Sequence, residues 1–102
     1  MMKTLIYVEK EQLPGIKLAH FEVLNTQEDV KHRDKQLMNA LTLGNLDHLK
    51  VKLHLCDADM NHLLVETTVW AVTDTRVCLK GNINIPKKAI LQVEINELLI
   101  QN

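Results

Sequence analysis

The stretch "LKGNINIPKKAILQVEI", residues 79–95, decides how the second half of the chain folds. Its two ends, "NINI" and "ILQVEI", alternate apolar and polar residues as strands with one buried face do. The Pro-Lys-Lys-Ala segment between them predicts a tight corner, because proline lacks the backbone donor that a continuing strand needs. The stretch therefore predicts two short strands joined by a sharp turn.

Three further strands are predicted between residue 47 and this corner. "LKVKLHLC" (49–56) alternates leucine and valine with lysine and histidine, which indicates a strand with one wet face. "LLVETTVWAVT" (63–73) is rich in β-branched residues, and "RVCLK" (76–80) follows it after the turn "TDT". Five strands with short turns over residues 47–96 favour a small antiparallel barrel. The longest strand, 63–73, has to bend to serve both sides of it.

The segment before the strands predicts an amphipathic helix over residues 26–44. Thr26 can cap its start, with Asp29 in an approximate capping-box position three residues later. Gly44 predicts its end, since glycine takes the left-handed conformation freely. Apolar residues at helical spacing form one stripe: Val30, Leu37, Met38 and Leu41. We expect the last three of them to point into the protein.

Residues 1–25 form an N-terminal extension whose structure the pattern defines least. "TLIYV" (4–8) and "IKLAHFEVL" (16–24) indicate an extended pair around Pro14-Gly15, which suits a type II turn. A short helix over 16–24 is the alternative. No linker or repeat divides the chain, so residues 1–102 are expected to form one domain, mainly β with one helix and of the α+β class.

Composition excludes several classes of protein. Apolar residues make up 46% of the chain and charged residues 25%, and the net charge of −1 gives no basic block for nucleic acid or a membrane surface. No apolar run has the length of a signal peptide or a membrane span. We therefore expect a cytoplasmic protein whose two cysteines, Cys56 and Cys78, are reduced and buried.

Residues able to carry chemistry are few. The chain has no serine, and Cys78 lies in an alternating strand, so no activated nucleophile is indicated. Paired carboxylates and phosphate-binding glycine loops are also missing from the sequence. His54, Cys56 and His62 can share one sheet face as a zinc-type ligand set, but scattered histidines on a wet face are the simpler interpretation. We predict no enzyme activity, no cofactor and no metal site.

Four segments carry a resemblance to a known family. "MNAL" (38–41), "VKLHL" (51–55), "VWAVTDTRVCLK" (69–80) and "IPKKAILQV" (85–93) resemble, in order, the helix end, first strand, central strands and corner of the Sm-like barrels, especially the bacterial Hfq-type RNA chaperones. "VETTVWAVTD" and "LKGNINIP" are also similar to a family of small uncharacterised bacterial proteins. The resemblance implies a five-stranded Sm-like or SH3-like barrel after an N-terminal helix, and rings formed through edge strands.

The resemblance also implies where RNA would bind, and most of those positions differ here. The aromatic residue that stacks on a base in that family falls on Thr75. Its two amide residues fall on Asp74 and Asp34, and its arginine rim falls on Thr42–Leu43. The first cation of the corner is kept as Lys87, and Lys88 replaces a histidine. Weak RNA binding through Lys87 and Lys88 is therefore the alternative rather than the favoured expectation.

The favoured functional prediction is a small non-enzymatic interaction module that self-associates or binds a protein. Ile83 and Ile85 alternate with asparagines on a candidate edge strand, which a second chain could pair with. The alternative is that the N-terminal extension covers that edge within one chain.

Trp70 alternates with Val69 and Ala71, so it points outward if Val69 points inward. It is then either an exposed contact residue for a partner or a residue covered by the helix or the extension. Five lysines either gather on one end of the barrel or form an ordinary solvated face: Lys50, Lys52, Lys80, Lys87 and Lys88.

Overall fold

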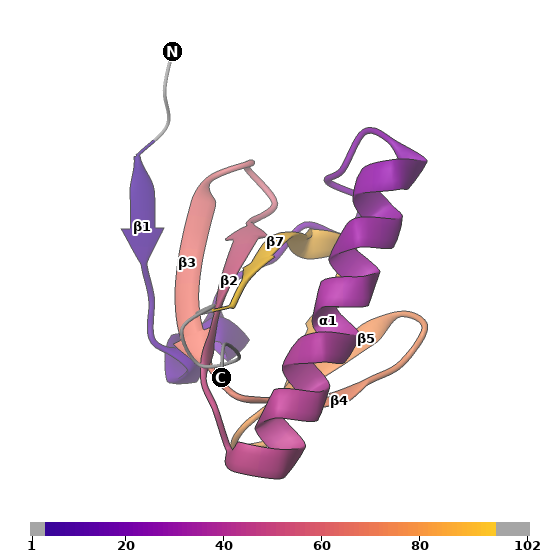
Figure 1. The fold of residues 1–102 in the computed structure, drawn as a ribbon. Helices are drawn as coiled ribbons and strands as arrows, with labels where there is room; N and C mark the ends of the chain where they lie inside the picture. Colours follow the sequence, from indigo (N-terminus) through magenta and orange to yellow (C-terminus); the bar gives the residue numbers. More distant parts are fainter. Residues whose placement is uncertain (1–3, 96–102) are drawn as a thin grey trace.

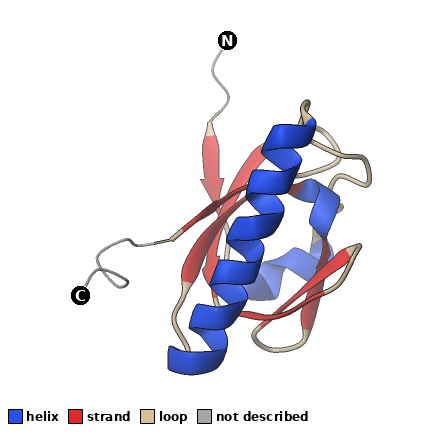
Figure 2. Ribbon diagram, turned by 45° about the vertical axis from the view of Figure 1, so that its right-hand side comes forward, coloured by secondary structure: helices blue, strands red, loops and turns tan. Residues whose placement is uncertain are grey.

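One long helix and seven strands in two sheets make up the fold of residues 4–95, which the computed structural model describes (Figures 1 and 2). The four-stranded sheet has the order β1 (Leu5–Tyr7), β3 (His62–Thr67), β2 (Val51–Cys56), β7 (Ile90–Glu94). The three-stranded sheet has the order β4 (Val69–Val72), β5 (Arg76–Leu79), β6 (Ile83–Pro86). The helix is α1 (Gln27–Asp47), and two 3₁₀ turns are η1 (Lys10–Gly15) and η2 (Lys87–Ala89). The expected α+β class with one helix is confirmed.

The predicted long strand is divided at a bend. Residues 62–67 form β3 in one sheet and residues 69–72 form β4 in the other, with Thr68 between them. Thr68 is buried, and its carbonyl accepts a hydrogen bond from the N–H of Lys80 at 2.9 Å. The bend therefore serves both sheets as expected, but the described strands pair as two separate sheets and do not close into one barrel.

β2 lies at the centre of the four-stranded sheet and shows the predicted alternation. It pairs antiparallel with β3 and with β7, while β1 adds to the outer side of β3 in a parallel direction. Val51, Leu53 and Leu55 are buried, whereas Lys52 is exposed and His54 half-buried. Two-residue periodicity therefore assigned the faces of this strand correctly.

The start of α1 matches the prediction, but its end does not. Thr26 caps the helix, because its hydroxyl oxygen accepts the N–H of Asp29 at 3.1 Å. The helix passes through Gly44 and ends at His48, which takes the left-handed conformation with φ of 55°. A Cβ at Gly44 would lie 2.6 Å from the carbonyl oxygen of Val69. The lack of a side chain at Gly44 therefore lets α1 approach the bend between β3 and β4, and Gly44 does not end the helix.

This close approach also fixes which face of α1 is buried. The buried residues follow a helical spacing: Arg33, Leu37, Ala40 and Gly44. Leu41 is half-buried against the core, but Met38 is 51% exposed, so its predicted inward position is wrong. The reason is that Met38 is about 100° around the helix from Leu37. A helix seated on Ala40 and Gly44 turns Met38 towards solvent.

The N-terminal extension differs most from expectation. β1 forms where a strand was predicted, but it pairs with β3 rather than with residues 16–24. Pro14 and Gly15 lie in η1, and Gly15 has no positive φ, so the type II turn is wrong. Residues 16–24 form neither a regular strand nor a helix and make one isolated bridge, Leu18 to Asp57. The 3₁₀ turn instead brings Leu13, 3% exposed, into the core.

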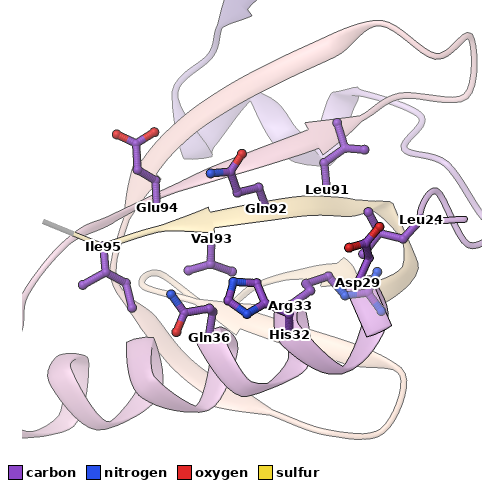
Figure 3. A pocket seen from close by; sticks show the side chains of 10 residues that line it. All are labelled: Leu24, Asp29, His32, Arg33, Gln36, Leu91, Gln92, Val93, Glu94 and Ile95. Atoms are coloured by element: carbon purple, nitrogen blue, oxygen red, sulfur yellow. The ribbon is translucent and has the colours of Figure 1, made fainter. Parts of the chain in front are cut away.

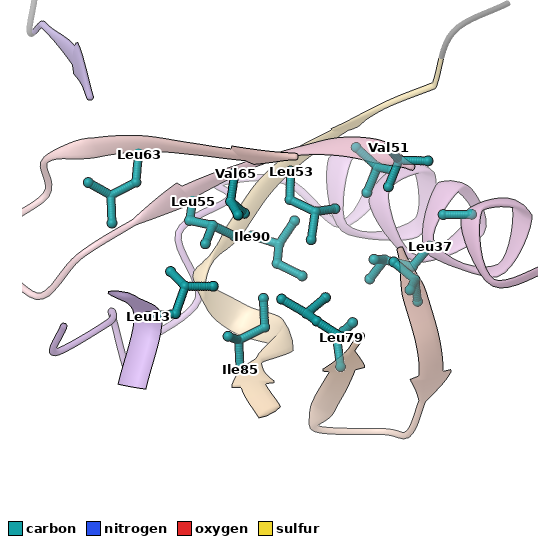
Figure 4. Packing of buried hydrophobic residues seen from close by; sticks show 14 residues of the cluster. Leu13, Leu37, Val51, Leu53, Leu55, Leu63, Val65, Leu79, Ile85 and Ile90 are labelled. Atoms are coloured by element: carbon teal, nitrogen blue, oxygen red, sulfur yellow. The ribbon is translucent and has the colours of Figure 1, made fainter. Parts of the chain in front are cut away.

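The core is aliphatic and joins α1, η1 and both sheets, as Figure 4 shows. Its largest fully buried side chains are Leu37, Leu53, Leu55, Leu79, Ile85, Ile90, Val65, Val69 and Val77. A second, smaller cluster holds Cys56 between Ala19 and Ala89, so Cys56 is buried as predicted, while Cys78 is half-buried. Among residues 4–95 no helix has the length and apolarity needed to cross a bilayer.

Candidate functional site

A groove of about 420 Å³ lies between α1 and the edge strand β7 (Figure 3). We call it the α1–β7 groove. Its apolar lining residues are Leu24, Leu91, Val93 and Ile95, and its polar lining residues include Asp29, His32, Gln36 and Glu94. β7 is the last strand of its sheet and pairs with β2 on one side only. The groove therefore borders a strand edge that has no strand partner within residues 4–95.

One end of the groove is built on a partly buried ion pair. Arg33 is 3% exposed, and its two terminal nitrogens donate to the two carboxylate oxygens of Glu22 at 2.6 and 2.8 Å. Arg33 also donates to the carbonyl of Ile90 at 3.1 Å and to Asp34 at 3.1 Å. This one side chain joins the N-terminal extension, α1 and β7, so it fixes the position of both groove walls.

The charges of this pair reinforce one another. Burial by itself raises the pKa of Glu22, but the hydrogen bonds and charge of Arg33, with the N–H of Leu24, bring that pKa below its ordinary value. Burial likewise lowers the pKa of Arg33, and the carboxylates of Glu22 and Asp34 more than offset it. Both groups are therefore charged at neutral pH. Arg33 was not among the site residues predicted from the sequence, although its spacing with Leu37, Ala40 and Gly44 was a usable signal.

A second cavity, of about 390 Å³, lies where α1, the β4–β5 turn and η2 meet. We call it the corner pocket. Its charged and polar lining includes Asp34, Asp74, Thr75, Arg76, Lys87 and Lys88. The carbonyl of Thr75 accepts the N–H of Lys87 at 2.9 Å, which ties the turn to the corner. Five positions that the family resemblance assigned to RNA contacts thus lie together, whereas Thr42 and Leu43 do not line this pocket.

A chain of hydrogen bonds crosses the outer face of the four-stranded sheet. Nδ1 of His54 lies 2.8 Å from Nε2 of His62, and Nε2 of His54 lies 3.0 Å from Oε1 of Glu94. We call these three residues the histidine chain. Burial, and then the neighbouring His54, lower the pKa of His62, which keeps its ring neutral near pH 7. The pKa of Glu94 is below its ordinary value, mainly because its carboxylate accepts the hydrogen bond from His54.

The prediction that His54, Cys56 and His62 share one sheet face is confirmed, because alternate residues of β2 and directly opposed residues of β2 and β3 lie on the same face. Cys56 is opposite His62 in the β2–β3 register, but it is buried in the small cluster with Ala19 and Ala89. Within the described part of the chain no group of three or more His, Cys, Asp or Glu residues is arranged to hold a metal ion. The three-ligand zinc alternative therefore has no support.

The candidate interface residues have different environments. Trp70 is 42% exposed and is the extra residue of a bulge, because Val69 pairs with Leu79 and Ala71 with Cys78. The alternative in which the helix or the extension covers Trp70 is therefore wrong.

The two isoleucines of β6 are less available. Ile83 is half-buried against the core, and Ile85 is only 1% exposed. The prediction of Ile85 as a contact residue is wrong, because this face of β6 packs inside the protein. Contact through β6 would have to use its backbone edge and the flank of Ile83.

The five lysines do not gather on one surface. Lys50 and Lys52 line a cavity beside Tyr7 and Glu66, whereas Lys87 and Lys88 line the corner pocket. Lys80 is exposed and lines neither. No single basic face follows from their arrangement.

Comparisons of the chain with protein-family models, with curated proteins and with solved structures found no match. They add no family and no activity to the geometry described above.

Proposed function

We propose that this protein is a small, non-enzymatic interaction module that self-associates, with the α1–β7 groove of one copy receiving β6 of a second copy. The observation that carries the proposal is the edge of β7 beside that groove, which pairs with no other strand of residues 4–95. An extended segment that adds to a sheet edge gains main-chain hydrogen bonds, and flanking pockets select its side chains. A cytoplasmic bacterial protein is the setting that the sequence resemblance suggests.

The strand order supports an Sm-like architecture as part of this proposal. β2 and β3 form one hairpin, the chain bends at Thr68, β4, β5 and β6 follow in order, and η2 leads into β7 beside β2. An Sm-like barrel has this succession of five strands, with β3 and β4 together as its bent second strand. A barrel that is only partly closed presents free edges, here β6 and β7.

Charge complementarity favours β6 as the occupant of the groove. The groove is lined by Asp29 and Glu94, and the charge of Arg33 at one end is balanced by Glu22 and Asp34. β6 is followed directly by Lys87 and Lys88 of η2. Pairing of two different edges is a heterologous contact, and such contacts produce rings when their rotation closes.

The rival arrangement is an edge covered within one chain. η1 packs against β6, and the place of a Cβ on Gly81 lies 3.7 Å from Cε of Lys10. If this contact blocks β6, the wild type will be monomeric at tens of micromolar by light scattering. A monomeric wild type would refute the proposed self-association.

Two variants test the pairing, each with its fold checked by circular dichroism. Ile95→Lys places a charge in the groove, and Ile83→Lys places one beside β6. Each should give a folded monomer, whereas Leu46→Lys, at a side chain 72% exposed on α1, should leave the oligomer intact. Mixing the first two variants should restore a 1:1 dimer, because one keeps an intact β6 and the other an intact groove. Failure of the mixture to associate would exclude the β6–β7 pairing.

The second candidate function is weak RNA binding at the corner pocket. Arg76, Lys87 and Lys88 gather there, which favours a phosphate-bearing ligand. Asp34 and Asp74 line the same pocket and oppose it, so we rank this function below self-association.

A further inference from the structure

We propose that His54 and His62 form a two-nitrogen site for a divalent transition-metal ion on the outer face of the four-stranded sheet. The two residues lie on neighbouring strands, β2 and β3, and Nδ1 of His54 faces Nε2 of His62 at 2.8 Å. Imidazole nitrogens suit nickel, copper, iron and zinc ions. The two ligand nitrogens lie outside the groove and the corner pocket, and only Glu94, the partner of His54, also lines the groove. The site therefore does not rest on the proposed function.

Glu94 sets the protonation of His54 in the manner that metal binding needs. Its carboxylate oxygen lies 3.0 Å from Nε2 of His54, and a carboxylate can only accept there, so Nε2 carries the proton. A neutral imidazole has one N–H, which leaves the lone pair of His54 on Nδ1, the nitrogen that faces His62. A carboxylate behind a histidine is the usual arrangement that orients a metal-binding ring and raises its basicity.

The spacing of the two nitrogens indicates which coordination geometry fits. Metal–nitrogen bonds of about 2.0–2.1 Å put two nitrogens about 2.9 Å apart at a right angle and about 3.3 Å apart at a tetrahedral angle. The observed 2.8 Å is nearer to the right angle. Right angles between ligands belong to square-planar and octahedral sites, whereas structural zinc is tetrahedral. The pair therefore fits nickel or copper better than zinc.

Binding requires only a small chemical change. Before the ion binds, the single proton of neutral His62 lies on Nε2, in the hydrogen bond to Nδ1 of His54. On binding, this proton moves through solvent to Nδ1 of the same ring, so no net proton is released and both facing nitrogens present lone pairs to the ion. The rings, now inclined at 52°, turn so that these lone pairs converge. Water completes the coordination shell, because no third His, Cys, Asp or Glu within residues 4–95 converges on the pair.

Nickel titration of the full chain tests the site, since Ni²⁺ does not oxidise the two thiols. We expect saturable 1:1 binding by calorimetry, tighter for Ni²⁺ than for Zn²⁺. Paramagnetic Ni²⁺ should broaden the amide signals of β2 and β3 next to His54 and His62 and leave those of α1 sharp. Broadening centred elsewhere, the opposite metal preference, or no saturation at millimolar Ni²⁺ would overturn the proposal.

Matched variants identify the ligands. His54→Gln and His62→Gln should each weaken Ni²⁺ binding at least tenfold, and Glu94→Gln should weaken it by about tenfold, as loss of a ligand-orienting partner does. His20→Gln is the control, because His20 is exposed and its ring contacts that of Phe21. Equal affinity in His62→Gln and the wild type, or an equal loss in His20→Gln, would assign the metal to another site. The amide spectrum of each variant shows whether it is folded.

Discussion

Arg33 shows how one buried charge holds three parts of the chain together. Its guanidinium binds Glu22 with two hydrogen bonds and also reaches the carbonyl of Ile90. We expect Glu22→Gln to lower the free energy of unfolding at pH 7 by about 1–3 kcal/mol, because a buried charged donor loses its partner. The larger cost of breaking a fully buried pair does not apply, since the Glu22 side chain is 30% exposed. Urea unfolding measures the difference.

The same pair predicts a pH dependence with a definite sign. The pKa of Glu22 in the folded protein is below the ordinary value of 4.5, so the unfolded chain binds a proton first as pH falls. The stabilisation is therefore complete above pH 4.5 and is lost as pH falls through the folded pKa. The difference in the free energy of unfolding between the wild type and Glu22→Gln should therefore decrease as the pH falls from 4.5 through the folded pKa of Glu22. A gap that is constant with pH would mean that the charge of Glu22 contributes nothing.

Gly44 is the second residue where a single contact decides the outcome. In a free helix Gly→Ala gains about 1 kcal/mol. Here the added Cβ would lie 2.6 Å from the carbonyl oxygen of Val69, so α1 has to move away from the bend. We expect Gly44→Ala to be destabilising by about 1–3 kcal/mol, as overpacked core substitutions are.

Gly15→Ala is the matched control for this substitution. Its Cβ would have no neighbour within 4 Å, and no positive φ opposes it. It should be neutral or stabilise by up to about 1 kcal/mol. Stabilisation by Gly44→Ala in the same denaturant series would show that α1 does not approach the bend so closely.

At the scale of elements, the rotation of α1 about its axis is the feature to test. Leu37 is fully buried, so Leu37→Ala should cost about 2–5 kcal/mol. Leu41 is half-buried, so Leu41→Ala should lower the free energy of unfolding by less than Leu37→Ala does. Met38 is 51% exposed, and Met38→Ala should change stability by no more than about 0.5 kcal/mol. A larger loss of stability in Met38→Ala than in Leu37→Ala, measured by thermal or denaturant unfolding, would mean that the helix docks through another face.

At the scale of the whole molecule, the distribution of charge limits RNA binding. Asp34 and Asp74 share the corner pocket with its cations, and Thr75 offers no ring for a base. Stacking on an aromatic ring contributes about 1–3 kcal/mol per base, which this pocket lacks. We expect no sub-micromolar binding of oligouridine at physiological salt in a filter-binding assay. Tight binding that falls steeply with salt and disappears in Lys87→Ala would reverse the ranking of the two functions.

Local sequence patterns were sufficient to predict the elements whose signals come from neighbouring residues. Alternation over residues 49–55 assigned the faces of β2, and Thr26 marked the start of α1. The Pro-Lys-Lys-Ala corner became η2 between β6 and β7. Asp74, Thr75 and Lys87 of the corner pocket were grouped by the family resemblance and not by a local pattern. Such patterns are reliable because their energies depend on residues a few positions apart.

The features that depend on contacts distant in sequence could not be predicted in this way, because they follow from how the elements pack. The helix passes through Gly44 because the gain from seating it against the bend exceeds a propensity cost of about 1 kcal/mol. That seating turned Met38 outward and Arg33 inward, where Glu22 became its partner. Register between strands brought His54 onto His62. A periodicity shows that a helix or strand has two faces, but the neighbouring element determines how it is rotated and which polar groups meet, because only packing brings those groups within bonding distance.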